Sequence, residues 1–481
     1  MPRQAEAGQK MAVEADATIW AAQVFGRCNL GDARRTARLV KTVAGLAVNR
    51  GGSVAQAHKW DAAGQEGGYR LLRNPRVSVA AMDEAAFQST VQRVQSTARL
   101  LAIDDSTSLS YAHSVADELG YTTSQPTSKS KGLFVHSTLL IDAESEMTEG
   151  LIAQYRWSRK AVHYGKKHQR TKTRYEQKES YKWTRNARAM RERLADKMAD
   201  VVAVCDRESD IFDYLHDKLM HGERFIVRAA QDRQLLEADA RLFAAVASAS
   251  KCGEMSVAIA QRGERKARVA QISLRAECVE LPAPRRSECH GDKATITVNI
   301  VLAKEDTSTA DDEPLCWYLL TTEAIASADQ LRDIVRCYGL RWRIEDFHKA
   351  WKSGAKVEAM RMQSRDALER MIVMLAQVAI RMLQLRETLN NETAAKRPCT
   401  DVLNDLEWKI LWASDMKTPN ALPGQVPTLR WAYEAIARLG GFYDSKRTGR
   451  ASWEAVYRGW QLLNDRVQSY RIMVTLAGAV S

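Results

Sequence analysis

Four side chains with the spacing of one helical face stand out near residue 345. They are separated by 3, 4 and 7 residues: Tyr338, Arg341, Glu345 and Lys352. At about 100° per residue, an α-helix would place them within an arc of roughly 60°. A carboxylate would then stand among two cations and a phenol, which suits a metal ion beside a phosphate. A solvated helix with ordinary i, i+4 ion pairs would show the same spacing, so other residues must decide.

Two aspartates upstream favour the metal-site interpretation. Asp105 follows the apolar run 100–103 and Asp104, and Asp206 follows the apolar run 201–205. Short continuous apolar runs predict buried central strands, which would place each aspartate at a strand's carboxyl end, where ligand sites of α/β sheets lie. An aspartate in this position is also a common helix cap or turn former.

Three carboxylates that converge on one place repel each other unless cations neutralise them. Hard oxygen ligands of this kind suit magnesium or manganese. Two such ions about 3.5–4 Å apart can activate a water or a 3′-hydroxyl on one side of a phosphorus and stabilise the leaving oxygen on the other. Asp105, Asp206 and Glu345 are therefore candidates for phosphoryl-transfer chemistry.

Beyond these residues, nearly the whole chain resembles the bacterial cut-and-paste DDE transposases of the insertion-sequence-four family. The family's Tyr, Arg, Glu, Lys signature matches Tyr338, Arg341, Glu345 and Lys352 one for one. The other motifs that carry the resemblance lie, in order, at residues 31–40, 65–70, 100–111, 201–211, 436–442 and 444–449.

The resemblance implies a ribonuclease-H-like core with a DDE triad at Asp105, Asp206 and Glu345. It also selects these residues over their neighbours Asp104 and Asp346, which periodicity alone does not exclude. Two Mg²⁺ ions, for which Mn²⁺ can substitute, would be held by the triad. Arg341 and Lys352 would contact phosphates near the scissile bond and Tyr338 would hydrogen-bond the DNA backbone, since a guanidinium fork suits a phosphate.

Two further residues are assigned through the resemblance. Trp317 matches a family tryptophan that stacks on a base flipped out of the transposon end during hairpin formation, and stacking of this kind is worth about 1–3 kcal/mol. Without the resemblance, a core position would be the ordinary interpretation of a tryptophan. Arg228 matches a family arginine near the same DNA strand, and a plain cation at the end of a strand is the alternative.

The charge of the chain favours a polyanionic partner. There are 71 Lys and Arg against 59 Asp and Glu, a formal charge of +12. Residues 27–76 hold ten Lys or Arg and three acids, and Arg34, Arg35, Arg38 and Arg70 are the leading candidates for recognition of the element end. Residues 156–197 hold fifteen Lys or Arg and four acids, interleaved with aromatics that could stack on unpaired bases. A solvated basic helix is the alternative for each segment.

The predicted fold class is α/β, a ribonuclease-H-like core with an inserted antiparallel β-subdomain between helical terminal domains. The expected domains are a helical DNA end-recognition domain at 1–78, the catalytic domain at 79–390 with an insertion at about 230–327, and a helical dimerisation domain at 391–481. Strands are expected near 98–104, 131–142, 148–156, 200–205 and 223–229, with inserted strands at 268–274 and 294–302. Helices are expected around 176–198, from 368 and from 429.

The sequence also bears on location and metal chemistry. It contains no run of 18 apolar residues and no secretory hydrophobic segment near the start, so we expect a cytoplasmic protein, associated with the nucleoid when bound to DNA. None of the eight cysteines form a C-x-x-C pair, which argues against a zinc site and favours reduced thiols.

The residue pattern and the resemblance together predict a magnesium-dependent DNA transposase. The resemblance implies that it acts as a synapsed homodimer on the ends of a mobile element and on target DNA, and that it would nick, form and resolve a hairpin, and transfer strands. Two alternatives remain: an end-binding regulator without catalysis, which would need a broken triad, and a ribonuclease-H-like DNA nuclease, which would hydrolyse without joining strands.

Overall fold

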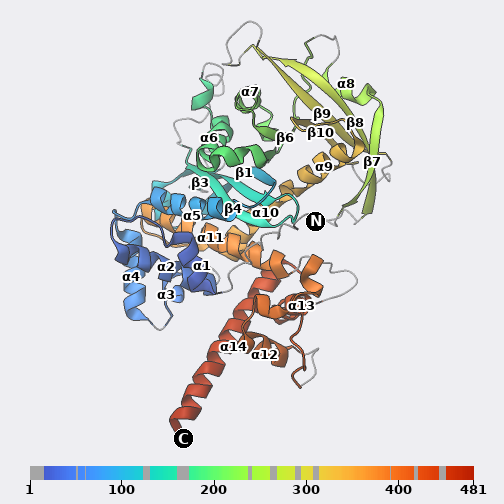
Figure 1. Cartoon of the computed structure of the whole chain (residues 1–481). Helices are drawn as coiled ribbons and strands as arrows, with labels where there is room; N and C mark the ends of the chain where they lie inside the picture. The colour runs from blue at the N-terminus through green and yellow to red at the C-terminus, as the bar shows by residue number, and fades with distance from the viewer. Residues whose placement is uncertain are drawn as a thin grey trace, which may run out of the picture.

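The computed structural model describes most of the chain (Figure 1). The described residues are 16–49, 52–59, 61–122, 131–159, 173–236, 241–259, 268–285, 287, 294–306, 314–389, 392–415, 421–443 and 451–480. The motif at 444–449 and residues 160–172 of the basic aromatic segment lie outside these ranges.

One mixed sheet forms the centre of the fold (Figure 1). Its hydrogen-bonded order is β2-β3-β1-β5-β6-β10-β9-β8-β7, and β4 pairs with β3. Antiparallel β4, β3 and β1 are followed by β5 and β6, which run parallel to β1, and this half is the ribonuclease-H-like core. The strands are β1 Leu100–Tyr111, β2 Gly120–Tyr121, β3 Lys131–Asp142, β4 Thr148–Trp157, β5 Val201–Cys205, β6 Arg224–Arg228, β7 Lys251–Ile259, β8 Arg268–Pro282, β9 Thr295–Glu305 and β10 Cys316–Thr321.

The inserted strands continue the core sheet. β10 pairs antiparallel with β6 on one side and with β9 on the other, and β8 and β7 follow. The two inserted strands expected at 268–274 and 294–302 lie within β8 and β9, which are longer than expected. Because the sheet is continuous, residues of β10 lie beside the core strand β6 and can reach the same site.

The end of β1 differs from the end that the sequence predicted. The strand was expected to end near residue 104, but it runs to Tyr111, so Asp105 lies inside the strand. The reason is that β3 pairs with β1 over its whole length, while β5 pairs with it only as far as Asp104, opposite Cys205. Asp105 is thus the first β1 residue beyond the end of β5, which still brings it to the carboxyl edge of the parallel pair.

Helices lie on both sides of this sheet and at both ends of the chain. The amino-terminal ones are α1 Ala17–Phe25, α2 Ala33–Val48, α3 Val54–Ala57, α4 Ala62–Arg73 and α5 Val79–Arg93. Each starts at an Asp or Ser whose side chain accepts a backbone N–H of the first turn, which is the preferred chemistry for a helix start. The others are α6 Lys182–Leu194, α7 Phe212–Met220, α8 Leu242–Ser248, α9 Ala328–Gly339, α10 Arg343–Lys349, α11 Arg365–Leu389, α12 Asp405–Ser414, α13 Leu429–Leu439 and α14 Trp453–Val480.

Helix α11 is the long buried helix that the sequence predicted from residue 368. Nearly all of its side chains are buried, and it packs against β4, α5, α2 and α4. Two of its arginines tie the amino-terminal helices to it. Arg370 is buried and donates hydrogen bonds to the carbonyls of Val77 and Leu72 at 2.7 and 2.8 Å, and the guanidinium of Arg381 lies 4.9 Å from the ring centre of Trp20. The amino-terminal helices are therefore fixed relative to the sheet.

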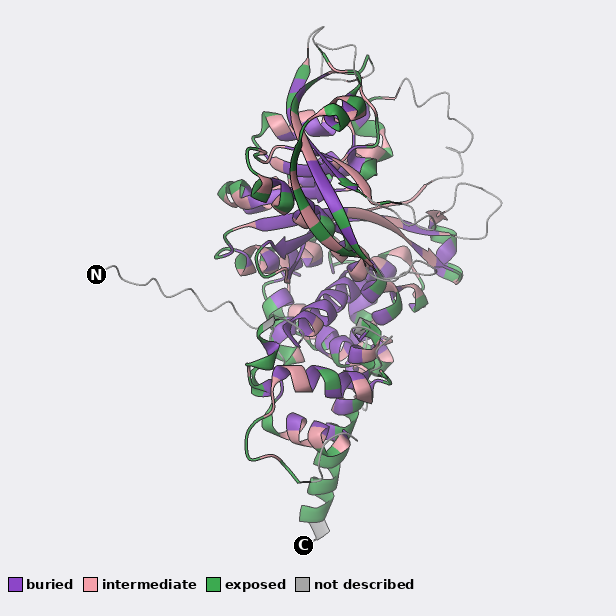
Figure 2. Cartoon of the chain, turned by 90° about the vertical axis from the view of Figure 1, so that its right-hand side faces the viewer, coloured by how far each residue is buried: buried purple, intermediate pink, exposed green. Residues whose placement is uncertain are grey.

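The carboxyl-terminal helices have a hydrophobic core of their own. α13 and α14 pack closely where Gly440 meets Gly459, since a Cβ at either position would lie within 2 Å of a backbone oxygen. Beyond this contact the last turns of α14 extend away from the rest of the fold and are exposed (Figure 2). In the described part of the chain, no helix is both long enough and apolar enough to cross a lipid bilayer.

Candidate active site

The first two predicted carboxylates lie on neighbouring parallel strands. Asp105 accepts the backbone N–H of Ser106 at 2.7 Å and its side chain is 21% exposed. Asp206 directly follows β5 and accepts the N–H of Glu208 at 2.9 Å, so it also caps a short 3-10 turn. The local capping function that sequence analysis held open is thus present at Asp206, and it orients the carboxylate at the strand end.

Glu345 reaches the same place from the first turn of α10. The guanidinium of Arg341 links it to β1: Nη2 lies 2.8 Å from Glu345 Oε1, and Nη1 lies 3.9 Å from Asp105 Oδ2. The pKa of Asp105 is raised from 3.8 to about 6, chiefly by burial and also by the charges of Asp206 and Glu345, while the hydrogen bond from Ser106 and the charge of Arg341 oppose the rise. The structure therefore brings the three carboxylates within electrostatic reach of one another.

The segment that carries Glu345 is less regular than one helical face. α9 ends at Gly339, residues Leu340–Trp342 form a 3-10 turn, and Ala350–Gly354 form a π turn after α10. A residue advances by about 120° in a 3-10 turn and by less than 100° in a π turn, so the arc calculated for a uniform α-helix does not apply. Local departures of this kind are common at functional sites.

Lys352 lies in that π turn, and its positive charge affects His348, which lies one turn earlier. His348 is buried, and burial together with the charge of Lys352 lowers its pKa from 6.5 to about 3. The imidazole is therefore neutral at physiological pH. His348 was not among the site residues predicted from the sequence.

Tyr338, Trp317 and Arg228 form a second group beside the triad. The rings of Trp317 and Tyr338 meet edge to face, with centroids 4.9 Å apart. Arg228 donates from Nη2 to the carbonyl of Cys316 at 3.2 Å, and burial raises the pKa of Tyr338 while a hydrogen bond with Arg228 and the charge of Arg341 oppose that rise. The half-buried Trp317 is thus both a packing residue and a neighbour of the site.

The structure separates Asp105 from its neighbour Asp104. Successive residues of a strand face opposite sides, and Asp104 is buried, accepts a hydrogen bond from the hydroxyl of Thr138, and lies 3.7 Å from Cys205 Sγ. Behind the same strand, His136 Nδ1 lies 3.0 Å from Ser106 Oγ. The buried Asp104, Thr138 and His136 hold β1 in place, and of these only Asp104 was considered from the sequence.

The neighbour of Glu345 is likewise engaged elsewhere. Asp346 pairs with Arg386 of α11 at 3.2 Å. Trp342, which sequence analysis did not single out, is 46% exposed and lies against Arg341, with 4.8 Å between the guanidinium carbon and the ring centre. The exposed indole thus supports one side of the arginine.

The four amino-terminal arginines differ in what they are free to contact. The side chains of Arg34 and Arg70 are 92% and 77% exposed, and among the described residues they form ion pairs with the nearby acids Asp32 and Glu66. By contrast, Arg35 donates to the carbonyl of Leu30 at 2.7 Å. Arg38 lies against α4, where a Cβ on Gly67 would come within 2.6 Å of its guanidinium carbon.

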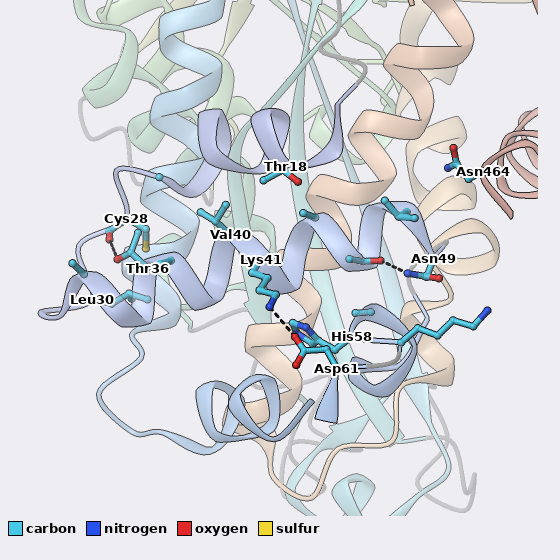
Figure 3. A pocket seen from close by; sticks show the side chains of 18 of the residues that line it. Thr18, Cys28, Leu30, Thr36, Val40, Lys41, Asn49, His58, Asp61 and Asn464 are labelled. Atoms are coloured by element: carbon cyan, nitrogen blue, oxygen red, sulfur yellow. Dashed lines mark hydrogen bonds and ion pairs between the residues drawn. The ribbon is translucent and has the colours of Figure 1, made fainter. Parts of the chain in front are cut away.

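A groove of about 1250 Å³ runs along the amino-terminal helices (Figure 3). It is lined by α1, α2, the segment around His58 and one side of α14, and no triad residue borders it. Its polar groups are largely paired within the protein, as in the 2.7 Å contact of Lys41 with Asp61 and the hydrogen bond of Thr36 to the carbonyl of Cys28. The carboxylate site is therefore separate from this groove.

The described part of the basic aromatic segment contacts aromatic residues of β3 and β4 that lie outside it. Trp157 stacks between Phe134 and Tyr155, with ring centroids 5.4 and 5.3 Å apart. Arg159 lies 4.1 Å from the ring centre of Phe134, and Arg185 lies 4.3 Å from that of Tyr155. The chain's own cations therefore lie over the rings of Phe134 and Tyr155.

The carboxylate set fits a divalent metal ion by its chemistry. Asp105, Asp206 and Glu345 offer only hard oxygen donors, which Mg²⁺ and Mn²⁺ prefer. As the side chains stand, no group of three His, Cys, Asp or Glu residues within the described ranges is close enough to hold a metal ion. An ion held by all three would require these carboxylates to move closer together, and Arg341 contacts two of them.

Comparison with protein families gives two matches. Residues 17–77 match the family described as "Transposase DNA-binding", and residues 134–381 match the family described as "Transposase DDE domain". The first match covers Arg34, Arg35, Arg38 and Arg70. The second covers Asp206 and Glu345 together with Arg228, Trp317 and the segment from Tyr338 to Lys352, whereas Asp105 lies before it.

Burial of Asp105 gives a pH-dependent stability. Between pH 3.8 and about 6 the folded chain keeps a proton that the unfolded chain has released, so the free energy of unfolding falls as pH rises through this window. We expect Asp105→Asn, in EDTA, to stabilise the chain by about 1–3 kcal/mol at pH 7.5 and to have little effect at pH 4.

Urea denaturation of the two proteins at both pH values measures this difference. Asp346→Asn serves as the control, because its carboxylate is more exposed and paired with Arg386. An Asp105→Asn effect that is equal at pH 4 and pH 7.5 would show that burial of the charge is not its origin.

Proposed function

We propose, because the chain belongs to the DDE transposase family, that this DNA transposase moves a mobile element by cut-and-paste transposition. The observation that supports the proposal is the electrostatic coupling of Asp105 to both Asp206 and Glu345, with Arg341 between Asp105 and Glu345. An end-binding regulator would not require this set. A nuclease would use it for hydrolysis alone.

In the proposed reaction, the three carboxylates hold two Mg²⁺ ions, and Mn²⁺ can replace them. When bound, the ions would polarise the scissile phosphate and favour ionisation of the attacking hydroxyl. Arg341 would hold a phosphate oxygen with its guanidinium fork and Lys352 would add a second positive charge. The phenol of Tyr338, fixed by Trp317 and Arg228, would hydrogen-bond the DNA backbone.

The order of steps is the one that the family resemblance implies, and one site would catalyse every step. Nicking at the element end would free a 3′-hydroxyl, which would attack the opposite strand and close a hairpin. Hydrolysis of the hairpin and transfer of the 3′-end to target DNA would follow at the same carboxylates. Joining of a 3′-end to target DNA distinguishes this function from that of a nuclease.

The terminal regions would bring the DNA ends together. We assign recognition of the element end to the helical region up to residue 78 and formation of a homodimer to the region from 391. The exposed apolar side chains at the end of α14 support a contact with a second copy, since exposed apolar patches mark interaction sites. They are Tyr470, Ile472, Met473, Val474 and Leu476, each more than half exposed.

Loss of any triad carboxylate should abolish cleavage and leave end binding intact. Asp105→Ala, Asp206→Ala and Glu345→Ala each remove metal ligands, whereas phosphate contacts supply most of the binding free energy. Gel shift and cleavage assays on a linear fragment bearing the native element ends measure the two activities separately. Asp346→Ala, beside Glu345, should cut at close to the parent rate. A triad variant that retains more than a few per cent of that rate would remove its residue from the triad.

Arg34 and Arg70 should contribute to sequence-specific recognition. Both are exposed, and an arginine that pairs with a guanine edge discriminates by about 1–3 kcal/mol. We expect Arg34→Ala or Arg70→Ala to weaken binding to the element end while binding to random DNA changes little. Competition binding at fixed salt measures the ratio. Equal weakening on both DNAs would mean that these side chains contact only phosphates.

Trp317→Ala should act after the first nick. Without the stack on a flipped nucleotide, nicked ends should accumulate. The activation free energy of hairpin formation should rise by about 1–3 kcal/mol. An abasic site at the flipped position should partly restore the hairpin. Because Trp317 also packs on Tyr338, Trp317→Phe is the matched control and should retain most of the activity. Equal slowing of nicking and hairpin formation with a lower melting temperature would make Trp317 a packing residue only.

A further inference from the structure

The position of Arg341 is unusual for a residue whose proposed ligand is a phosphate. Its two terminal nitrogens lie 2.8 Å from Glu345 Oε1 and 3.9 Å from Asp105 Oδ2. Its side chain is 11% exposed, and its guanidinium lies 4.8 Å from the ring centre of Trp342. Arg341 is therefore a well-placed internal partner for two of the carboxylates proposed to bind metal.

A guanidinium in this place competes with a divalent cation. Carboxylate oxygens that accept charge-assisted hydrogen bonds from arginine are turned toward it, and their negative charge is partly neutralised. Within the described residues the carboxylates are also not close enough to form a metal site. A cation can gather them only if Arg341 gives up at least one of its two contacts.

A DNA phosphate offers Arg341 an alternative partner. Guanidinium binds phosphate with two parallel hydrogen bonds, so a phosphate would replace the one hydrogen bond to Glu345 and the 3.9 Å ion pair with Asp105 by two hydrogen bonds. Such an exchange would leave the triad with a larger uncompensated negative charge at the moment when DNA is present. The affinity of the triad for a divalent cation would then rise.

We propose that Arg341 is an internal counter-ion that keeps the triad from loading metal in the free protein and that transfers to a DNA phosphate to permit loading. This inference rests on the proposed function. It makes Arg341 a residue that couples DNA binding to metal binding, in addition to any contact with the scissile strand.

Binding of Mn²⁺ to the full-length chain, followed by the electron paramagnetic resonance signal of the free ion, tests the proposal without any measurement of cleavage. Without DNA, Arg341→Gln should bind Mn²⁺ about ten-fold more tightly than the parent or better, since a nearby positive charge is lost. Arg341→Lys should lie between the two, because one ammonium cannot span both carboxylates. Arg386→Gln is the matched control: it removes the same charge from Asp346, next to Glu345, and should change the affinity by less than about three-fold.

A second measurement adds DNA. A 20-base-pair duplex of arbitrary sequence at low salt should tighten Mn²⁺ binding to the parent chain and have no such effect on Arg341→Gln. Thermal melting should show a larger Mn²⁺-dependent stabilisation of Arg341→Gln than of the parent. Arg341→Lys keeps the test valid if the glutamine variant fails to fold.

The outcomes separate this inference from the proposed function. Equal Mn²⁺ affinity in the parent, Arg341→Gln and Arg341→Lys would overturn the counter-ion role, provided that Asp105→Asn still weakens Mn²⁺ binding. If Asp105→Asn leaves Mn²⁺ binding unchanged in the Arg341→Gln background, the carboxylates are not the metal site and the proposed function itself fails. An equal gain in Arg341→Gln and Arg386→Gln would assign the effect to general charge and would also overturn the inference.

Discussion

Mutual repulsion among three partly buried carboxylates is the constraint on which this structure depends. Asp105, Asp206 and Glu345 come from two parallel strands and one helix, and the charges of Asp206 and Glu345 raise the cost of ionising the buried Asp105. Such a set persists only where the surrounding fold determines its position, and it lowers the stability of the chain at neutral pH. Arg341 reduces that cost by contacting two of the three.

The rest of the core can be understood as the support for this arrangement. β1 is paired along its whole length with β3, so the side-chain direction of Asp105 cannot slip to the other face. The buried Asp104, Thr138 and His136 fix the strand from behind. On the other side, α11 packs under the sheet and holds the amino-terminal helices through Arg370. Few of these residues contact the carboxylates of the site, yet each restricts the positions that those carboxylates can take.

Sequence patterns predicted the presence of strands and helices better than they predicted where these elements end or how regular they are. The apolar run 201–205 correctly indicated β5 and placed Asp206 after it, because a buried strand needs little context to be recognised. The end of β1 was wrong, because pairing with β3 extends through a Ser- and Thr-rich stretch that carries no apolar signal. The helix near residue 345 was expected to be uniform, and its 3-10 and π turns arise from tertiary packing that a 3.6-residue period cannot encode.

The same limit applies to charged side chains. Arg34, Arg35 and Arg38 look alike in sequence, but only contacts with the fold show that Arg35 is held by a carbonyl and that Arg38 lies against α4. Trp317 is a similar case, since the sequence around it does not show that its ring in β10 packs against the ring of Tyr338 in α9. Residues whose partners lie far away in the chain are those for which the structure was needed.

Helix α14 links the region of the DNA-binding match to the end of the chain. The hydroxyl of Tyr457 donates to the carbonyl of Ala47 in α2 at 2.7 Å, and further along α14 borders the groove on the same helix (Figure 3). The exposed apolar turns begin just beyond. In the proposed dimer, a second copy would pack on those turns of α14, and α14 is itself packed against α2. The relative position of two recognition regions would follow from helix packing alone, without a flexible connection between recognition and assembly.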